Sequence, residues 1–325
     1  MEEGSEVKKD EMVSVGMNVT EEFLAGLNRG EKIAASAVRV LSDVVRKSSA
    51  GTLMELEHDI RKASDQMQNS VSAAALSLKA VCELFLVFVT RVSLDSKRSF
   101  EQCRQELIAR GEKFVESTEI CVHTIAKTAA RFVRDSSTIL THGNSKLVST
   151  ILERAAVQDG KSFHVYVTET RPQGDGFKVA ARLRKQNIPV TMILDSAVGA
   201  IMEKVDMVLV GAEAVVENGG LVNRVGTFLL AMAAKTFNKP FYVASESYKF
   251  ARLYPLSQKE LPSVPAIKNG NGWDAMIPEV QSDSEAQFEN ITSDFTPASY
   301  ITLLFSDVGV LTPAAVSDEL IRLYI

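Results

Sequence analysis

The chain has 325 residues, of which 46% are hydrophobic, and a formal net charge of −5. This length allows two domains, and this apolar content supports a core that folds without disulfides or metals. The acidic balance and the absence of a dense block of Lys and Arg argue against nucleic acid as a partner, because affinity for a phosphate backbone comes from clustered cations.

The cysteines and the N-terminus bear on the cellular compartment. Cys82, Cys103 and Cys121 are odd in number, show no CxxC spacing and fall within helical patterns. We therefore expect reduced, buried thiols and a reducing compartment. The first ten residues are too charged for a secretory signal, and charges interrupt the most apolar stretch, 73–92. The sequence thus predicts a cytosolic protein with no membrane partner.

The first 134 residues carry the apolar spacing of amphipathic helices. Thr20 is the expected N-cap of the first helix, and Thr52 is that of a later one. Besides the helix that Thr20 begins, helices are predicted at 33–45, 52–68, 73–92 and from 97 to about 125. This half of the chain is expected to be helical throughout.

Short apolar runs rich in β-branched residues dominate the chain from residue 138 onward. Each run ends in a polar or ionisable residue and is followed by a helical pattern. Such runs suit parallel strands that are buried on both faces, with the helices as crossovers. Strands are predicted at 138–141, 163–168, 190–194, 207–212, 240–244 and 300–305.

The predicted fold class is α/β, with an N-terminal helical domain (1–134) packed on a Rossmann-like parallel-sheet domain (135–325). Residues 255–298, rich in Pro, Gly, Asn and Ser, are expected to form a polar excursion. Thr312 and Pro313 begin a last helix, and we expect a second copy of the chain to cover its apolar surface. In an open parallel sheet, ligands bind beyond the carboxyl ends of the strands.

Common cofactor motifs are missing. Gly174 and Gly176 fit the first spacing of a dinucleotide-binding GxGxxG fingerprint, but Val179 stands in place of its third glycine. Walker A, GxSxG, HExxH and EF-hand patterns do not occur, and the histidines show no ligand spacing. The sequence therefore predicts neither a metal nor another cofactor.

Two glycine-containing turns follow predicted strands. The segment 217–224 carries two glycines and ends in Arg224, and the segment 169–174 carries Arg171 and Gly174. Free amides at a helix start attract anions, and an arginine adds a charge-assisted bond. A plain strand-to-helix turn is the simpler interpretation of either segment alone, whereas two such turns on one edge favour a small phosphorylated ligand.

Three carboxylates also follow predicted strands: Glu169, Asp195 and Glu213. Their position at the sheet edge fits roles as acid and base. Beside Arg171 and Arg224 they fit structural ion pairs equally well. The pattern of residues leaves both interpretations open.

Several of these segments resemble a known family. The similarity covers the chain from about residue 134 onward, and the helical N-terminal half agrees in size and character. The matching runs are Thr-Ile-Leu-Thr-His (138–142), Val-Tyr-Val-Thr-Glu-Thr-Arg-Pro (165–172), Ile-Leu-Asp-Ser-Ala-Val-Gly (193–199), Val-Gly-Ala-Glu (210–213), Glu-Asn-Gly-Gly-Leu-Val-Asn (217–223), Lys-Pro-Phe-Tyr-Val (239–243) and Leu-Thr-Pro-Ala-Ala-Val-Ser-Asp-Glu-Leu (311–320). They resemble the alpha, beta and delta subunits of eukaryotic translation initiation factor 2B, and the alpha-type subunits in particular. That family shares its fold with methylthioribose-1-phosphate isomerase and ribose-1,5-bisphosphate isomerase.

The resemblance implies that the sheet edge binds a ligand without catalysing a reaction. The isomerases hold a cysteine after the Thr-His strand end and an aspartate after the Val-Gly-Ala strand end, where this chain has Gly143 and Glu213. A missing thiol and a carboxylate displaced by about 1 Å imply a protein that is not an enzyme. The implied ligand is a sugar phosphate or a nucleoside monophosphate. The implied binding residues are His142, Asn144, Glu169, Arg171, Asp195, Glu213, Asn223 and Arg224.

The resemblance also implies partners. It implies a homodimer, formed through the sheet domain, that joins two copies of a guanine-nucleotide exchange complex containing beta, gamma, delta and epsilon subunits. It further implies that the chain senses the phosphorylated alpha subunit of initiation factor two. Two alternatives remain: an active sugar-phosphate aldose-ketose isomerase, which Gly143 disfavours, and a free-standing metabolite-binding protein, which co-purification with partner subunits would exclude.

Overall fold

The computed structural model describes residues 17–71, 75–93, 99–171, 173–261 and 291–324. The chain forms two compact units, one within residues 1–71 and 81–116 and the other within 72–80 and 117–325. Helices α4 (Ala75–Ser93) and α5 (Phe100–Ala129) contribute to both units. The units thus divide inside these helices, whereas the sequence suggested a boundary near residue 134, just before the first strand.

The first unit is helical, as its apolar spacing predicts. It contains α1 (Val19–Asn28), α2 (Ile33–Lys47) and α3 (Leu53–Ser70), together with parts of α4 and α5. Phe23, Leu41 and Leu56 are completely buried in it. Gly111 of α5 lies so close to α2 that a Cβ there would approach Ser42 Oγ to 2.0 Å. Glycine therefore sets the contact between these two helices.

The helix starts of this unit test two predicted N-caps. The side chain of Thr52 accepts a hydrogen bond from the amide of Glu55 at 3.2 Å, which confirms the prediction for α3. The prediction for Thr20 is wrong, because Asn18 is the N-cap of α1 and accepts from the amide of Glu21 at 3.2 Å. Both side chains suit an N-cap, and the chain begins its helix at the earlier one.

The second unit is built on a seven-stranded sheet in the order β11-β10-β7-β4-β1-β2-β3. All neighbouring strands in this main sheet are parallel except β11, which pairs antiparallel with β10 at one edge. The parallel arrangement predicted from the apolar runs is confirmed. The strands are β1 (Thr138–Thr141), β2 (His164–Thr168), β3 (Val190–Ile193), β4 (Met207–Val210), β7 (Phe241–Ala244), β10 (Leu303–Ser306) and β11 (Gly309–Leu311).

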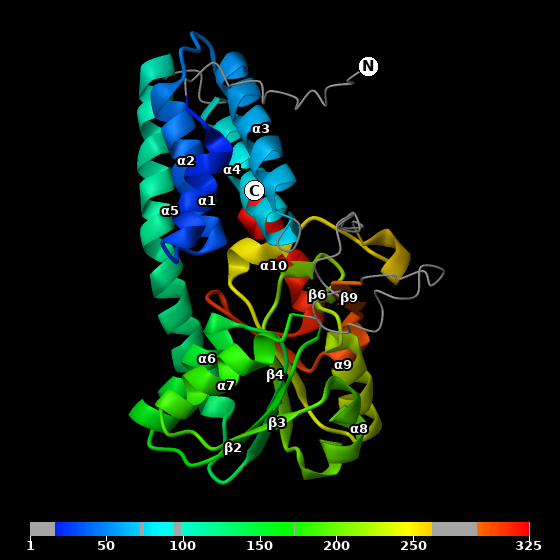
Figure 1. The fold of residues 1–325 in the computed structure, drawn as a ribbon. Coiled ribbons are helices and arrows are strands. Elements are labelled where there is room, and N and C mark those ends of the chain that lie inside the picture. Colours follow the sequence, from blue (N-terminus) through cyan, green and yellow to red (C-terminus); the bar gives the residue numbers. More distant parts are fainter. Residues whose placement is uncertain (1–16, 72–74, 94–98, 172, 262–290, 325) are drawn as a thin grey trace, which may run out of the picture. The chain divides into compact units, whose positions relative to one another are not determined.

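Helices cover both faces of the main sheet (Figure 1). The C-terminal part of α5, with α6 (Lys146–Glu153) and α7 (Asp175–Lys185), packs on one face. On the other face lie α8 (Val198–Ile201), α9 (Thr227–Thr236) and α10 (Val316–Tyr324). Successive strand residues point to opposite cores, which is why these strands are apolar throughout rather than alternating.

A second sheet, of four strands in the order β8-β5-β6-β9, was not predicted. It consists of β5 (Ala214–Val216), β6 (Leu221–Arg224), β8 (Phe250–Ala251) and β9 (Ser293–Thr296). The segment 217–224 was predicted as a strand-to-helix turn, and this is wrong: β5 and β6 form an antiparallel hairpin. Gly219 enables the hairpin turn with φ +77°, and a Cβ there would lie 2.2 Å from the carbonyl oxygen of Pro313.

Two further predictions, for the polar excursion and for the last helix, differ from the structure. The predicted excursion, 255–298, contains strand β9, and its residues 262–290 lie outside the described residues. The last helix was expected to expose its apolar face for a second copy of the chain. Instead, Val316 and Leu320 are buried in the chain's own core, while Ile321 is exposed. The side chain of Tyr324 and the residue Ile325, which belong to the same predicted surface, lie outside the part of the chain that the structure describes.

The three cysteines lie in helices, as the pattern around them predicted. All three cysteines are free thiols; Cys82 and Cys103 are buried and Cys121 is partly so. Burial raises the pKa of the Cys82 thiol to about 11. In the part of the chain that the structure describes, no helix combines the length and apolar character needed to cross a bilayer.

Candidate functional site

The predicted site residues gather at the carboxyl edge of the main sheet, around the point where the strand order reverses between β1 and β4. Crevices that bind ligands in open parallel sheets form at such a point. The loop after β1 and the loop after β4 approach closely there, since a Cβ on Gly211 would lie 2.5 Å from Ser145 Oγ. Ser145 in turn caps α6 through the amide of Val148 at 3.2 Å.

His142 follows β1 directly and is completely buried. Its Nε2 lies 2.9 Å from the carbonyl oxygen of Val225, and its Nδ1 lies 2.6 Å from Thr168 Oγ1. Burial lowers the pKa of this imidazole, although Asp195 and the Val225 carbonyl act in the opposite direction. In the neutral ring Nε2 donates to the carbonyl, so Nδ1 accepts from the Thr168 hydroxyl. His142 therefore connects the end of β1 to the end of β2 and to the turn before α9 through two hydrogen bonds.

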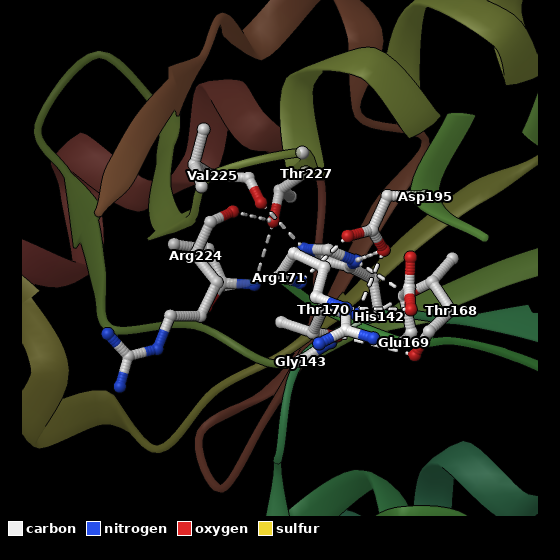
Figure 2. A network of polar contacts seen from close by, with 12 residues as sticks. His142, Gly143, Thr168, Glu169, Thr170, Arg171, Asp195, Arg224, Val225 and Thr227 are labelled. Carbon is white, nitrogen blue, oxygen red and sulfur yellow. Dashed lines mark hydrogen bonds and ion pairs between the residues drawn. The ribbon is translucent and has the colours of Figure 1, made fainter. Parts of the chain in front are cut away.

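Asp195 holds the loop after β2. Its two carboxylate oxygens accept hydrogen bonds from the amides of Thr170 at 2.9 Å and Arg171 at 2.7 Å. Thr170 has φ +58°, which is unusual for a β-branched residue, and its hydroxyl accepts the amide of Gly143 at 3.0 Å. Figure 2 shows these groups facing one another around the His142 ring. Asp195 thus fixes the backbone geometry of this loop.

Two arginines line the outer part of this edge. Arg171 pairs with Glu169 at 2.8 Å, and the Arg171 side chain is half exposed. Arg182 of α7 donates to Ser149 at 2.9 Å and lies 3.5 Å from Asn144 Oδ1. The Arg171 guanidinium is thus positioned by an ion pair yet open to solvent, which suits an anion-binding group.

Glu213 and Arg224 lie at the end of the second sheet. Arg224 Nε is 3.6 Å from Glu213 Oε1, and Ser293 donates to Glu213 Oε2 at 3.0 Å. Burial raises the pKa of Glu213, against the effects of Arg224, Ser293 and Lys249. Figure 2 shows the Arg224 side chain directed away from the His142 ring, so the predicted residues form two groups.

The turn from β6 into α9 connects these two groups. Asn223 donates to Thr227 Oγ1 at 3.1 Å, and that hydroxyl donates to the Arg224 carbonyl at 2.7 Å. Gly226 adopts φ +103°, and a Cβ there would lie 2.9 Å from His142 Cε1. Only glycine allows this turn to press against the imidazole.

Asp294 of β9 is a residue of this site that sequence reasoning missed. Its Oδ2 accepts the amides of Gly226 at 2.7 Å and Phe228 at 3.0 Å, which places a carboxylate at the start of α9. Burial raises the pKa of Asp294 to about 7, although these two amides lower it. The sequence signal for this strand is weak, because Thr-Ser-Asp-Phe-Thr (292–296) has β-favouring Thr and Phe but no alternation of apolar and polar residues.

The polar groups at this edge suit an anion. Within the described ranges, no three His, Cys, Asp or Glu side chains are grouped so as to hold a metal ion. What the edge offers is a half-exposed guanidinium at Arg171, a largely buried one at Arg224 and loops fixed by hydrogen bonds. Such an arrangement fits a small anionic ligand whose other end carries hydrogen-bonding groups.

Comparisons with known proteins place the chain in a family. Residues 28–313 match the model of the initiation factor 2 subunit family. Translation initiation factor eIF2B subunit alpha of Dictyostelium discoideum is 45% identical over 90% of this chain and 91% of that protein. Ribose 1,5-bisphosphate isomerase of Archaeoglobus fulgidus is 31% identical over 88% of this chain and 90% of its own length. The chain therefore belongs to the initiation factor 2 subunit family.

Solved structures support the fold. A chain of the tetrameric eIF2B-beta2-delta2 complex from C. thermophilum has a TM-score of 0.73 with 19% identity, covering 94% of each chain. At this identity the likeness concerns the fold alone. The predicted α/β class and the family resemblance are both confirmed.

Proposed function

We propose that this protein is a non-catalytic regulatory subunit of the guanine-nucleotide exchange factor for initiation factor two. The observation that supports this most strongly is the 45% identity with an alpha subunit over 90% of the chain. By analogy with those relatives, its partners are the beta, gamma, delta and epsilon subunits, a second copy of itself, and the phosphorylated alpha subunit of initiation factor two. The proposed location is the cytosol.

The local geometry supports the absence of catalysis. Gly143 stands where the resemblance places a cysteine; it has no side chain to carry a proton, and its amide is bonded to Thr170. Glu213 is buried and held by Arg224 and Ser293. We expect no turnover of ribose 1,5-bisphosphate or methylthioribose 1-phosphate, followed by NMR at high protein concentration. Turnover that disappears in Glu213→Gln would favour the isomerase instead.

A gain-of-function variant sharpens this test. A Cβ on Gly143 would meet only Arg224 Cγ at 3.7 Å and Cβ at 3.9 Å, so the space for a side chain exists, although φ is +77°. The double variant Gly143→Cys, Glu213→Asp restores both implied catalytic groups. Detectable turnover in this variant alone would show that these two positions separate the subunit from the isomerases. The single variant Glu213→Asp serves as the matched control.

We also propose that the sheet edge retains a pocket for a sugar phosphate or nucleoside monophosphate. The exposed Arg171 and the Arg224 guanidinium support the phosphate end, and the loops around them are already fixed. A ligand at a hundredfold its dissociation constant stabilises a fold by about 2.7 kcal/mol, so thermal shift is a sensitive assay. Equal shifts in the wild type and in an Arg171→Ala, Arg224→Ala variant would place the ligand elsewhere.

The proposed assembly role needs its own experiment. The homodimer is expected to join two exchange assemblies, so native mass measurement on the complex purified through this chain should show two copies of it with two sets of the other subunits. Analytical ultracentrifugation of the chain alone should show a dimer at micromolar concentration. A stable monomer there would contradict the bridging role, and equal affinity for phosphorylated and unphosphorylated initiation factor two would contradict the sensing role.

A further inference from the structure

The end of the second sheet contains a buried pair of carboxylates, Glu213 and Asp294, with one arginine beside Glu213. Asp294 and Glu213 interact with each other, and Arg224 lies 3.6 Å from Glu213. Lys249 also acts on Glu213, but its ammonium pairs with Glu246 at 2.9 Å. Among the described residues, Arg224 is therefore the cation next to the pair that is not also paired with another carboxylate, and burying two carboxylates beside one such cation is costly.

Two atoms in this group are buried without a hydrogen-bond partner among the described residues. They are Asp294 Oδ1 and Arg224 Nη1. Asp294 as a whole is only 9% exposed. Asp294 Oδ2, by contrast, accepts both amides at the start of α9. One acceptor and one donor are thus left unused within the same cluster, and buried polar groups of this kind normally find a partner.

The described groups that face Asp294 come from α9 and from the segment between β4 and β5. They are the amides of Gly226 and Phe228 from the start of α9 and Glu213 from the segment after β4. Behind Glu213 lie Arg224 of β6 and Lys249. His142 faces the same turn, is kept neutral by burial and is itself influenced by Arg224. A carboxyl with a pKa of about 7 in this setting is partly protonated at neutral pH.

We propose that binding of an anion at this edge is coupled to uptake of a proton from solvent by the Glu213–Asp294 pair. This inference rests on the proposed ligand-binding function. An anion bound at the Arg224 guanidinium draws on the same positive charge that lowers the pKa of Glu213. Because an adjacent guanidinium lowers a carboxyl pKa by roughly 1–3 units, sharing it with a ligand raises the pKa of the pair.

The structure also identifies the atom that carries the proton. Asp294 Oδ1 accepts no hydrogen bond from the residues that the structure describes, so protonation there leaves the two α9 amides bonded to Oδ2. The linkage makes anion affinity rise as the pH falls from about 8 to about 6, by up to tenfold per pH unit when a whole proton is taken up. Ligand occupancy of the subunit would then follow the acidity of its surroundings.

Calorimetry on the intact chain tests this linkage. Glucose 6-phosphate, ribose 5-phosphate and adenosine monophosphate serve as probes, and the one that binds most tightly is titrated near neutral pH in two buffers of different ionisation enthalpy. The same titration is made on Asp294→Asn, whose side-chain oxygen still accepts the α9 amides. The probe's own phosphate contributes equally to the titrations of the wild type and of the variant. The difference in proton uptake between the two proteins is therefore due to Asp294. We expect the wild type to take up a large fraction of a proton more than the variant.

The outcomes separate this inference from the proposed function. Binding with equal proton uptake in both proteins would overturn the linkage and leave the ligand pocket standing. No binding of any probe to the wild type would overturn both. If Asp294→Asn fails to fold, Glu213→Gln removes the other member of the pair and should lose the same proton uptake; an unchanged uptake there would again overturn the linkage.

Discussion

The carboxyl edge of the main sheet and the end of the second sheet differ in how completely their polar atoms are paired. Around His142, both ring nitrogens and both oxygens of Asp195 have hydrogen-bond partners. Around Glu213, the atoms Asp294 Oδ1 and Arg224 Nη1 are buried and have no such partner in the described part of the chain. A fully paired network fixes the backbone and resists change, whereas an incomplete one is ready to accept a ligand or a proton.

The largest loss of stability should come from a substitution that forces two backbone segments of the main-sheet edge apart. A Cβ on Gly176 would lie 1.8 Å from the carbonyl oxygen of Thr168, whose hydroxyl contacts His142. We expect Gly176→Ala to lower the free energy of unfolding by on the order of 3–5 kcal/mol, measured by urea unfolding. Gly199→Ala is the matched control, because nothing lies within 4 Å of its Cβ position. Equal unfolding midpoints for the two variants would contradict the close approach.

Removing the Asp195 side chain should have the next largest effect. Asp195→Ala leaves the amides of Thr170 and Arg171 without their acceptor, and we expect a loss of about 2 kcal/mol in stability. Asp195→Asn retains one acceptor oxygen and should lose clearly less. The two variants are compared by thermal unfolding. If they are equally destabilised, the charge of Asp195 matters and its hydrogen bonds do not.

The neutral His142 predicts a dependence of stability on pH. Burial lowers the pKa of the folded-state imidazole, so folding opposes its protonation. Stability is complete above the ordinary pKa of about 6.5 and falls as the pH drops below it, by up to about 1.4 kcal/mol per pH unit. His142→Gln should flatten that acid decline in unfolding free energy measured between about pH 7.5 and 5.5. Parallel declines in the two proteins would contradict a buried neutral histidine.

The smallest effect on stability should come from Arg171, where binding is expected to dominate. Its ion pair with Glu169 is half exposed, so Arg171→Ala should change stability by no more than about 0.5 kcal/mol. Sugar-phosphate affinity should nevertheless fall about tenfold, because a charge-assisted bond is lost. Arg322→Ala removes a comparable exposed pair with Glu319 on α10, which carries none of the predicted site residues. Equal affinities in these two variants would remove Arg171 from the site.

Sequence patterns alone located the six parallel strands of the main sheet, whereas the antiparallel edge strand β11 was not predicted. The central strands are buried on both faces, so a short run of β-branched residues marks them without any knowledge of their neighbours. The same reasoning placed His142, Glu169 and Asp195 on one edge, because the ends of parallel strands necessarily meet there. The family resemblance was likewise carried by local runs of residues.

Only the tertiary structure decided what those side chains do. Asp195 became a backbone acceptor and His142 a fixed link because their partners come from neighbouring loops. Asp294 reached the start of α9 through the pairing of β9 with β6, and it lies 68 residues from the amide of Gly226 that it binds. Short strands joined across such distances leave little local pattern, since their partners supply most of their stabilisation. The residues of the edge could thus be predicted from the sequence, whereas their pairing depended on contacts between distant parts of the chain.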